Sequence, residues 1–299
     1  MQAKFTQGVQ LGLTWPGTVS SRERRNPTSF SLVSPKVLPQ GWLCPPLNCS
    51  SKYSAASTSS ETDYYLFSSP ETYLQAIYPS SFSKLPPTIM RHLQFKSQKV
   101  KFQLNNRCLY LVGLMGSGKT TVGKEISQAL KYSFIDSDAL IEQSAEGSTV
   151  REIFQTYGEP FFRDTETQVL KKLSAMRGLV VSTGGGAVIR PINWRYMREG
   201  VTVWLDVPVE TLARRIAAVG TESRPLVHLE GRDPYEQALD RLTKLSEDRS
   251  ECYGNADARV SVESIAVKLG YHDVSDVTVA DISLEALEKV EEHLQKEVV

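Results

Sequence analysis

Apolar positions along this chain are concentrated in short runs that alternate with longer segments of helical spacing. Five runs predict buried strands over residues 109–112, 133–135, 179–181, 201–205 and 259–262. Apolar residues at helical intervals predict helices over 119–130, 139–176, 191–198, 208–217, 234–252 and 283–297. Strands that are apolar throughout and separated by helices are typical of a parallel sheet covered on both faces. The pattern therefore predicts one α/β domain over residues 104–299.

The chain before residue 104 has a different composition. Residues 61–103 are rich in Ser, Pro and Tyr, which predicts a largely disordered linker. Residues 1–60 contain 11 serines and six basic residues against one acidic residue, with no sustained apolar period. Such a composition is typical of an organelle transit peptide, and its serine content favours a chloroplast address over a mitochondrial one. A disordered tail without an address is the alternative.

Charge and cysteine content exclude several classes of protein. The 34 basic and 34 acidic residues balance, so with a net +5 in residues 1–60 the remaining chain carries a net −5. An acidic body argues against broad nucleic-acid binding. No apolar run is long enough to span a membrane. The four cysteines form no CxxC pair, so neither a zinc site nor a disulfide framework is expected.

The first predicted strand runs directly into a glycine-rich segment. Its residues are Gly113, Leu114, Met115, Gly116, Ser117, Gly118, Lys119 and Thr120, and a predicted helix follows. In such a phosphate-binding loop the backbone N–H groups surround phosphate oxygens, the lysine adds a positive charge, and the threonine hydroxyl can reach Mg²⁺. A turn with an exposed lysine is the alternative, but every constrained position matches in the right context. The sequence therefore predicts a nucleotide-binding protein.

Acidic residues follow the second predicted strand. Asp136 and Asp138 come directly after it, at the edge of a parallel sheet where ligands gather. One carboxylate could bind Mg²⁺ through water, while the other accepts a hydrogen bond from a substrate hydroxyl. A purely structural alternative is that Asp136 or Ser137 caps the next helix.

Further polar and flexible positions come later in the chain. Arg163 and Glu166 are three residues apart on a predicted helix, a spacing that usually gives only a surface ion pair. The third strand ends in the three consecutive glycines 184–186, which would admit a ligand close to the backbone or simply form a flexible turn. Arg224 lies in a polar loop and Arg249 on a later helix. Phosphoryl transfer to an anionic acceptor needs cations of this kind.

Taken together, these motifs resemble those of the shikimate kinase family. The resemblance rests on GLMGSGKTTVGK, FIDSD, EPFFRDTE, VVSTGGGAV, SRPLV and EDRSECY in that order, over residues 107–275, and the leader resembles that of plastid members. It implies a three-layer P-loop kinase fold related to nucleoside monophosphate kinases. The fold would contain a five-stranded parallel sheet of order 2-3-1-4-5, a lid and substrate-binding helices. The implied reaction moves the γ-phosphoryl group of ATP to the 3-hydroxyl of shikimate.

The resemblance also implies a role for individual residues. Lys119 would contact the β- and γ-phosphates, Thr120 would bind Mg²⁺, and Asp136 would hold the metal's water shell, with Ser182 a weaker candidate. Asp138 would bind the shikimate hydroxyls and accept the proton. The acceptor site would further comprise Phe154, Phe162, Arg163, Gly184, Gly185, Gly186 and Arg249. The ATP site would comprise Gly113, Leu114, Met115, Gly116, Ser117, Gly118, Lys119, Thr120, Thr121 and the lid residue Arg224, and the protein would be a monomer or homodimer.

One position departs from the family pattern. Bacterial members often carry an arginine seven residues before the lid arginine, and here that position is Ala217. Arg214 or Arg215 could replace it against the adenine. Two alternatives to shikimate kinase stay open at this point, namely a kinase of the same fold for another hydroxy compound such as gluconate, and a non-catalytic relative.

Overall fold

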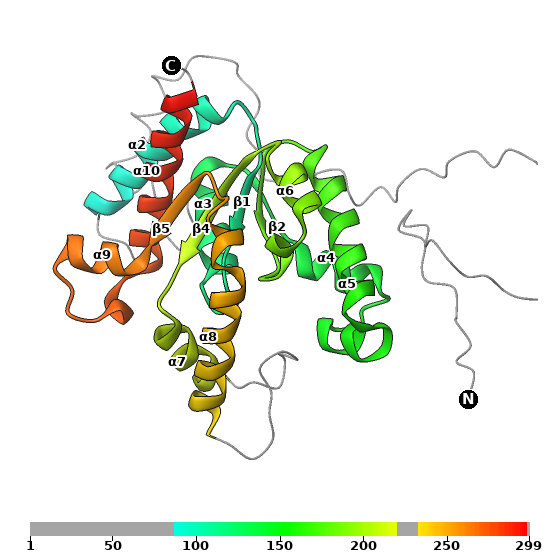
Figure 1. Ribbon diagram of the computed structural model, residues 1–299. Coiled ribbons are helices and arrows are strands. Elements are labelled where there is room, and N and C mark those ends of the chain that lie inside the picture. Colours follow the sequence, from blue (N-terminus) through cyan, green and yellow to red (C-terminus); the bar gives the residue numbers. More distant parts are fainter. Residues whose placement is uncertain (1–86, 220–232, 298–299) are drawn as a thin grey trace, which may run out of the picture.

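A computed structural model describes residues 87–219 and 233–297, and its centre is a five-stranded parallel sheet (Figure 1). The strands are β1 Leu109–Val112, β2 Ser133–Asp136, β3 Leu179–Ser182, β4 Val201–Asp206 and β5 Ala258–Ser261. Their order is β2-β3-β1-β4-β5, with every neighbouring pair parallel. The predicted fold class and strand order are thus confirmed. The expected transit segment 1–60, residues 61–86 of the expected linker and Arg224 lie outside the described residues.

Helices lie on both sides of this sheet (Figure 1). They are α2 Pro87–Leu104, α3 Lys119–Leu130, α4 Ser137–Ser144, α5 Val150–Ser174, α6 Pro191–Met197, α7 Val209–Val219, α8 Pro234–Tyr253, α9 Val262–Leu269 and α10 Val279–Glu297. Two short 3-10 turns, η4 Ala187–Ile189 and η5 Val274–Asp276, complete the described chain. The predicted helices are found within a few residues of their expected bounds, whereas α9 was not predicted. Among the helices of the described ranges, none is both long and apolar enough to cross a membrane.

The two strands at the middle of the sheet, β1 and β3, are buried along their whole length, as their largely apolar sequences predict. Every residue of β1 and of β3 is buried. Helix α3 packs closely over this part of the sheet because Gly123 has no side chain, and a Cβ there would lie 2.7 Å from the Phe134 ring. This close packing fixes the helix that follows the phosphate-binding loop.

Helix α5 is bent in a way that matters for the site. It begins with a capping box between Thr149 and Glu152, and Gly158 interrupts it with φ 82° and ψ 168°. A positive φ of this kind is accessible to glycine at little cost. Beyond the bend, Phe162, Arg163 and Glu166 are all buried.

Helix α2 is part of the folded domain, which therefore begins earlier in the chain than the sequence predicted. Its residues Met90, Leu93, Val100 and Leu104 are buried, and it packs lengthwise on α10. Figure 1 shows the two helices side by side. The prediction of a disordered linker is therefore wrong for residues 87–103. Few apolar residues mark this helix, and the partner that buries them lies almost 200 residues later in the chain.

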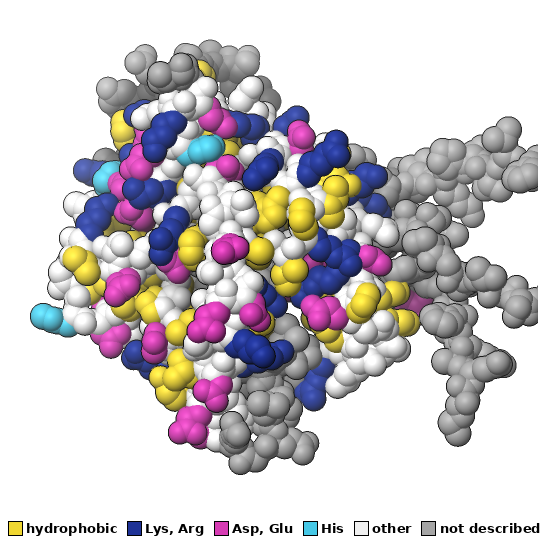
Figure 2. All heavy atoms as spheres, viewed as in Figure 1, with side chains coloured by type: hydrophobic (Ala, Val, Ile, Leu, Met, Phe, Trp, Pro, Cys, Tyr) yellow, Lys and Arg dark blue, Asp and Glu magenta, His cyan; other side chains and the backbone are white. Residues whose placement is uncertain are grey.

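Ion pairs add to the contact between α2 and α10. Glu291 lies 2.7 Å from the Lys96 ammonium and 2.5 Å from that of Lys99, and Arg107 lies 2.7 Å from Glu297. Basic and acidic side chains are accordingly intermixed over this region in Figure 2. Helix α10 also contacts α3 and β5, so it packs on the sheet as well as on its neighbouring helices.

If α2 belongs to the folded domain, a buried position on it should matter far more than an exposed one. Leu93 is 1% exposed and Phe95 is 68% exposed. Leu93→Ala should lower the free energy of unfolding by about 2–5 kcal/mol, because it leaves a cavity against the core. Phe95→Ala should change it by less than about 0.5 kcal/mol. Denaturant titration of the two variants checks this, and equal effects would contradict the assignment of α2 to the core.

Candidate active site

The phosphate-binding loop leaves β1 and ends at the first turn of α3. Three of its glycines have positive φ, at 147° for Gly113, 81° for Gly116 and 89° for Gly118. A Cβ on Gly113 would also lie 2.7 Å from the Leu205 carbonyl oxygen, so a side chain there would displace the backbone of β4. Gly118 is the N-cap of α3. The free backbone N–H groups at the N-terminus of α3 therefore lie at the loop, and their positive partial charge favours an anion there.

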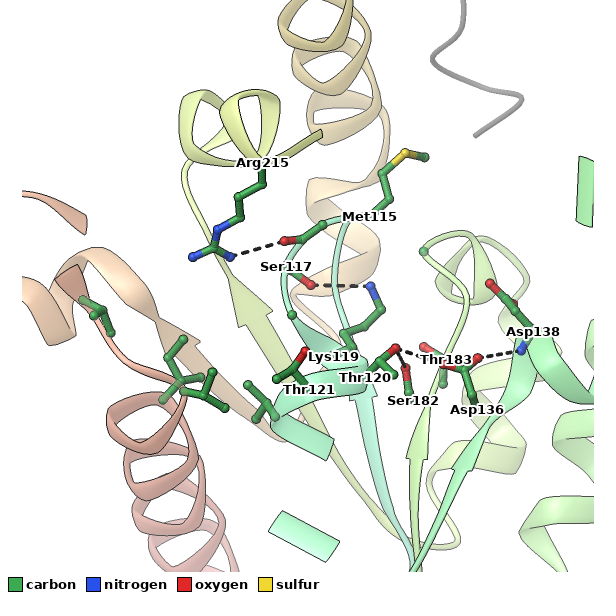
Figure 3. A pocket seen from close by; sticks show the side chains of 17 residues that line it. Met115, Ser117, Lys119, Thr120, Thr121, Asp136, Asp138, Ser182, Thr183 and Arg215 are labelled. Carbon is green, nitrogen blue, oxygen red and sulfur yellow. Dashed lines mark hydrogen bonds between the residues drawn. The ribbon is translucent and has the colours of Figure 1, made fainter. Parts of the chain in front are cut away.

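Lys119 sits buried at the centre of the loop (Figure 3). Its ammonium donates to the carbonyl oxygens of Gly113 and Leu114, both at 2.8 Å, and to the Ser117 hydroxyl at 3.4 Å. These contacts hold a full positive charge where the loop would receive phosphate oxygens.

Three oxygen-bearing side chains meet beside this lysine, from α3, β2 and β3. The Thr120 hydroxyl donates to the Asp136 carboxylate at 2.9 Å and lies 3.3 Å from the Ser182 hydroxyl (Figure 3). Hard oxygen ligands of this kind suit Mg²⁺, which usually keeps several waters and binds one or two carboxylates. Within the described residues, no group of three or more His, Cys, Asp or Glu could form an all-protein metal cage. The residues therefore fit Mg²⁺ bound together with a phosphate ligand.

Asp136 also caps the following helix, which was the structural alternative for this residue. Its second oxygen accepts from the backbone N–H of Asp138 at 3.1 Å and so caps α4. The neighbouring Ser137 hydroxyl accepts from the N–H of Gly184 at 3.1 Å. Helix capping is thus real here, and it leaves one Asp136 oxygen facing Thr120.

Asp138 and Glu166 each present an oxygen without a hydrogen-bond partner among the described residues. A Cβ on Gly184 would lie 2.6 Å from the Asp138 oxygen and 2.9 Å from the Glu166 oxygen, so both lie against the same glycine. Burial, and next the neighbouring Asp136, raises the pKa of Asp138 to about 6. Burial likewise raises the pKa of Glu166 to about 7, although Arg163 opposes it. Both acids are poised to accept hydrogen bonds from a ligand's hydroxyl groups.

Arg163 is held from two sides. It lies 3.0 Å from Glu166 and 3.0 Å from Glu159, and its guanidinium stands over the rings of Phe154 and Phe162 at 5.9 and 5.3 Å. The predicted pairing of Arg163 with Glu166 is confirmed, and the surface-pair alternative is wrong because both side chains are buried. Sequence reasoning missed Glu159, whose signal was its position four residues before the arginine.

The three glycines after β3 join these groups to Arg249. A Cβ on Gly186 would collide with the Arg163 guanidinium. The carbonyl oxygen of Gly185 accepts from Arg249 at 3.0 Å and from the Tyr253 hydroxyl at 2.7 Å. Asp138, Arg163 and Arg249 therefore lie around one backbone segment. Arg249 is 6% exposed, and within the described part of the chain no carboxylate pairs with it.

A cavity of about 610 Å³ lies over the loop and reaches this segment. One wall of it consists of Arg215, which the sequence had suggested, and of Val277, Val279 and Ile282, which it had not. Arg215 donates to the Gly116 carbonyl at 3.3 Å (Figure 3), whereas Arg214 is largely exposed and lies 3.7 Å from Asp273. Of the two arginines proposed to replace the one absent at Ala217, only Arg215 lines the cavity. Of the predicted site residues, the cavity is also lined by Met115 to Thr121, Asp136, Asp138, Ser182 and Gly185. The predicted residues Gly113, Leu114, Phe154, Phe162, Arg163, Gly184, Gly186 and Arg249 are not in its lining.

A family model described as shikimate kinase matches residues 115–290. The chain belongs to the shikimate kinase family. Shikimate kinase 3, chloroplastic, of Oryza sativa subsp. japonica is 58% identical over 207 residues, covering 69% of this chain and 72% of that protein. Shikimate kinase 1, chloroplastic, of Arabidopsis thaliana is 58% identical over 205 residues, covering 69% and 68%.

Solved structures agree with this family. Shikimate kinase from Bacteroides thetaiotaomicron has a TM-score of 0.50 and 29% identity, with coverage of 62% of this chain and 98% of that one. The predicted shikimate kinase family is confirmed, and a separate family of kinases for another hydroxy compound is not supported. The chloroplast location expected for residues 1–60 agrees with the names of these plant shikimate kinases.

The close fit of Gly186 to Arg163 can be tested by adding a methyl group. Gly186→Ala should lower the free energy of unfolding by about 1–3 kcal/mol, because the guanidinium and its buried ion pairs must move. Gly254→Ala is the matched control, since Gly254 has φ −59° and the new Cβ would approach backbone no closer than 3.3 Å. Denaturant midpoints measure both, and an equally small effect of the two changes would contradict the packing described here.

Proposed function

We propose that this chain transfers the γ-phosphoryl group of ATP to the 3-hydroxyl of shikimate, producing ADP and shikimate 3-phosphate. One observation carries the proposal beyond family membership. Buried Arg249, without a carboxylate partner among the described residues, lies at the same three glycines as Arg163 and Asp138. A buried cation of this kind favours an anionic ligand, and the nearby acid favours one that also carries hydroxyl groups.

The donor would bind along the phosphate loop. Lys119 and the N-terminus of α3 attract the β- and γ-phosphates, while Arg215 and the apolar wall of the cavity face the nucleoside end. Thr120 and Asp136, with Ser182 nearby, would hold Mg²⁺. When bound, the metal would neutralise charge on the phosphate oxygens.

The acceptor would bind on the other side of the glycine segment. Arg163 and Arg249 would take its carboxylate, and the rings of Phe154 and Phe162 would border it. Asp138 would orient the 3-hydroxyl and take its proton as the oxygen bonds to phosphorus and the bond to ADP breaks. Its raised pKa makes it a better proton acceptor while leaving it mostly ionised at pH 7.

Some of the expected roles rest on the family resemblance alone. Arg224, outside the described residues, would neutralise charge on the transferring group. We further propose that the enzyme acts in the chloroplast as a monomer or homodimer, without nucleic acid or membrane. A non-catalytic role is disfavoured because Lys119, Asp138, Arg163 and Arg249 are all in place.

The function is tested by following ADP release from the full chain supplied with ATP and Mg²⁺, with and without shikimate. Release should require both shikimate and Mg²⁺. Asp138→Asn should lower kcat by about 10²–10⁴-fold, because the carboxamide accepts no proton. Asp164→Asn is the matched control, since Asp164 lies on α5 with an exposed side chain paired to Arg190.

Two outcomes would overturn the proposal. One is ADP release by the folded protein that does not depend on shikimate. The other is an Asp138→Asn variant as active as the Asp164→Asn control.

A further inference from the structure

Tyr253 is a buried residue whose hydroxyl reaches the acceptor side of the site. It is the last residue of α8 and 2% exposed, and its hydroxyl donates to the Gly185 carbonyl oxygen at 2.7 Å. Arg249 stands one helical turn earlier and donates to the same oxygen at 3.0 Å. Two side chains of one helix face thus share a single backbone acceptor.

This sharing leaves most of the arginine free for a ligand. A carbonyl oxygen has two lone pairs, so Tyr253 and Arg249 together satisfy Gly185. A guanidinium has five N–H groups, and Arg249 directs one to the Gly185 carbonyl and at most one more to the Tyr253 hydroxyl. The remaining donors can form the fork that a carboxylate prefers.

The same carbonyl belongs to a segment that touches the donor site. A Cβ on Gly185 would lie 3.4 Å from the Gly113 oxygen and 3.4 Å from the Met115 nitrogen, so this peptide packs on the phosphate loop. Its orientation therefore affects how the acceptor lies relative to the transferring phosphate.

The tyrosine ring is itself held in place. It stacks on Trp204 with centroids 5.6 Å apart and planes 13° apart, and the Arg259 guanidinium lies 4.7 Å over the Trp204 ring. Burial raises the pKa of Tyr253 to about 12, although Arg249 opposes this. The phenol therefore remains a neutral donor at physiological pH.

We propose that Tyr253 is a positioning residue for the acceptor, acting through the Gly185 carbonyl to keep Arg249 available for the substrate carboxylate. This inference rests on the function proposed above. Without the hydroxyl, the buried carbonyl loses one of its two donors, and Arg249 turns a second N–H group toward it. The substrate carboxylate must then compete with the protein's own backbone for the guanidinium.

Tyr253→Phe removes the hydroxyl and keeps the ring on Trp204. It should raise the KM for shikimate by about 3- to 10-fold, the effect of one neutral hydrogen bond, and leave the KM for ATP unchanged. Tyr235→Phe is the matched control on the same helix, because the Tyr235 hydroxyl makes no hydrogen bond to the described residues. A merely structural tyrosine would lower the melting temperature and leave the ratio of the two KM values unaltered.

A double-mutant cycle tests the proposed route through the arginine. Shikimate affinity is measured by calorimetry for Tyr253→Phe, Arg249→Lys and the double variant. The two losses should not multiply, because the lysine already lacks the fork that Tyr253 preserves. Multiplying losses, or an unchanged KM for shikimate in Tyr253→Phe, would overturn the inference. A wild-type chain without shikimate-dependent ADP release would instead overturn the proposed function.

Discussion

The absence of side chains at three consecutive positions after β3 is the constraint on which the site depends. Gly184, Gly185 and Gly186 each lie against a different set of groups, namely the two acids, the phosphate loop with α8, and the Arg163 guanidinium. A Cβ at the first or third would collide with a charged side chain. Backbone at the end of a central strand thus forms the surface on which the proposed donor and acceptor sites would meet.

The two buried arginines differ in how the protein compensates their charge. Two carboxylates flank Arg163, so its position is set by the protein before any ligand arrives. Arg249 has a backbone carbonyl instead, and its charge is left for a ligand to neutralise. Burying such a cation costs free energy. Tyr253, which stacks on Trp204, donates to the same Gly185 carbonyl as this arginine. An anionic acceptor bound beside Arg249 would offset this cost.

The sequence predicted the sheet well because its inner strands are mostly apolar, and it predicted the loop because its glycines and lysine stand at fixed spacing. It failed where partners lie far apart along the chain. Helix α2 is buried by α10, and Tyr253 bonds to backbone 68 residues away. The apolar wall at Val277, Val279 and Ile282 carries no motif at all. Such features depend on tertiary packing and on backbone acceptors, which local patterns do not encode.

In the proposed enzyme, one small molecule would contact Asp138, Arg163 and Arg249 across the glycine segment. A crystal structure of the protein with ADP and shikimate tests this most directly. We expect the shikimate carboxylate to lie within hydrogen-bond distance of both Arg163 and Arg249, and a ring hydroxyl to lie within that distance of Asp138. A carboxylate that contacts neither arginine, or a shikimate bound away from Asp138, would contradict it.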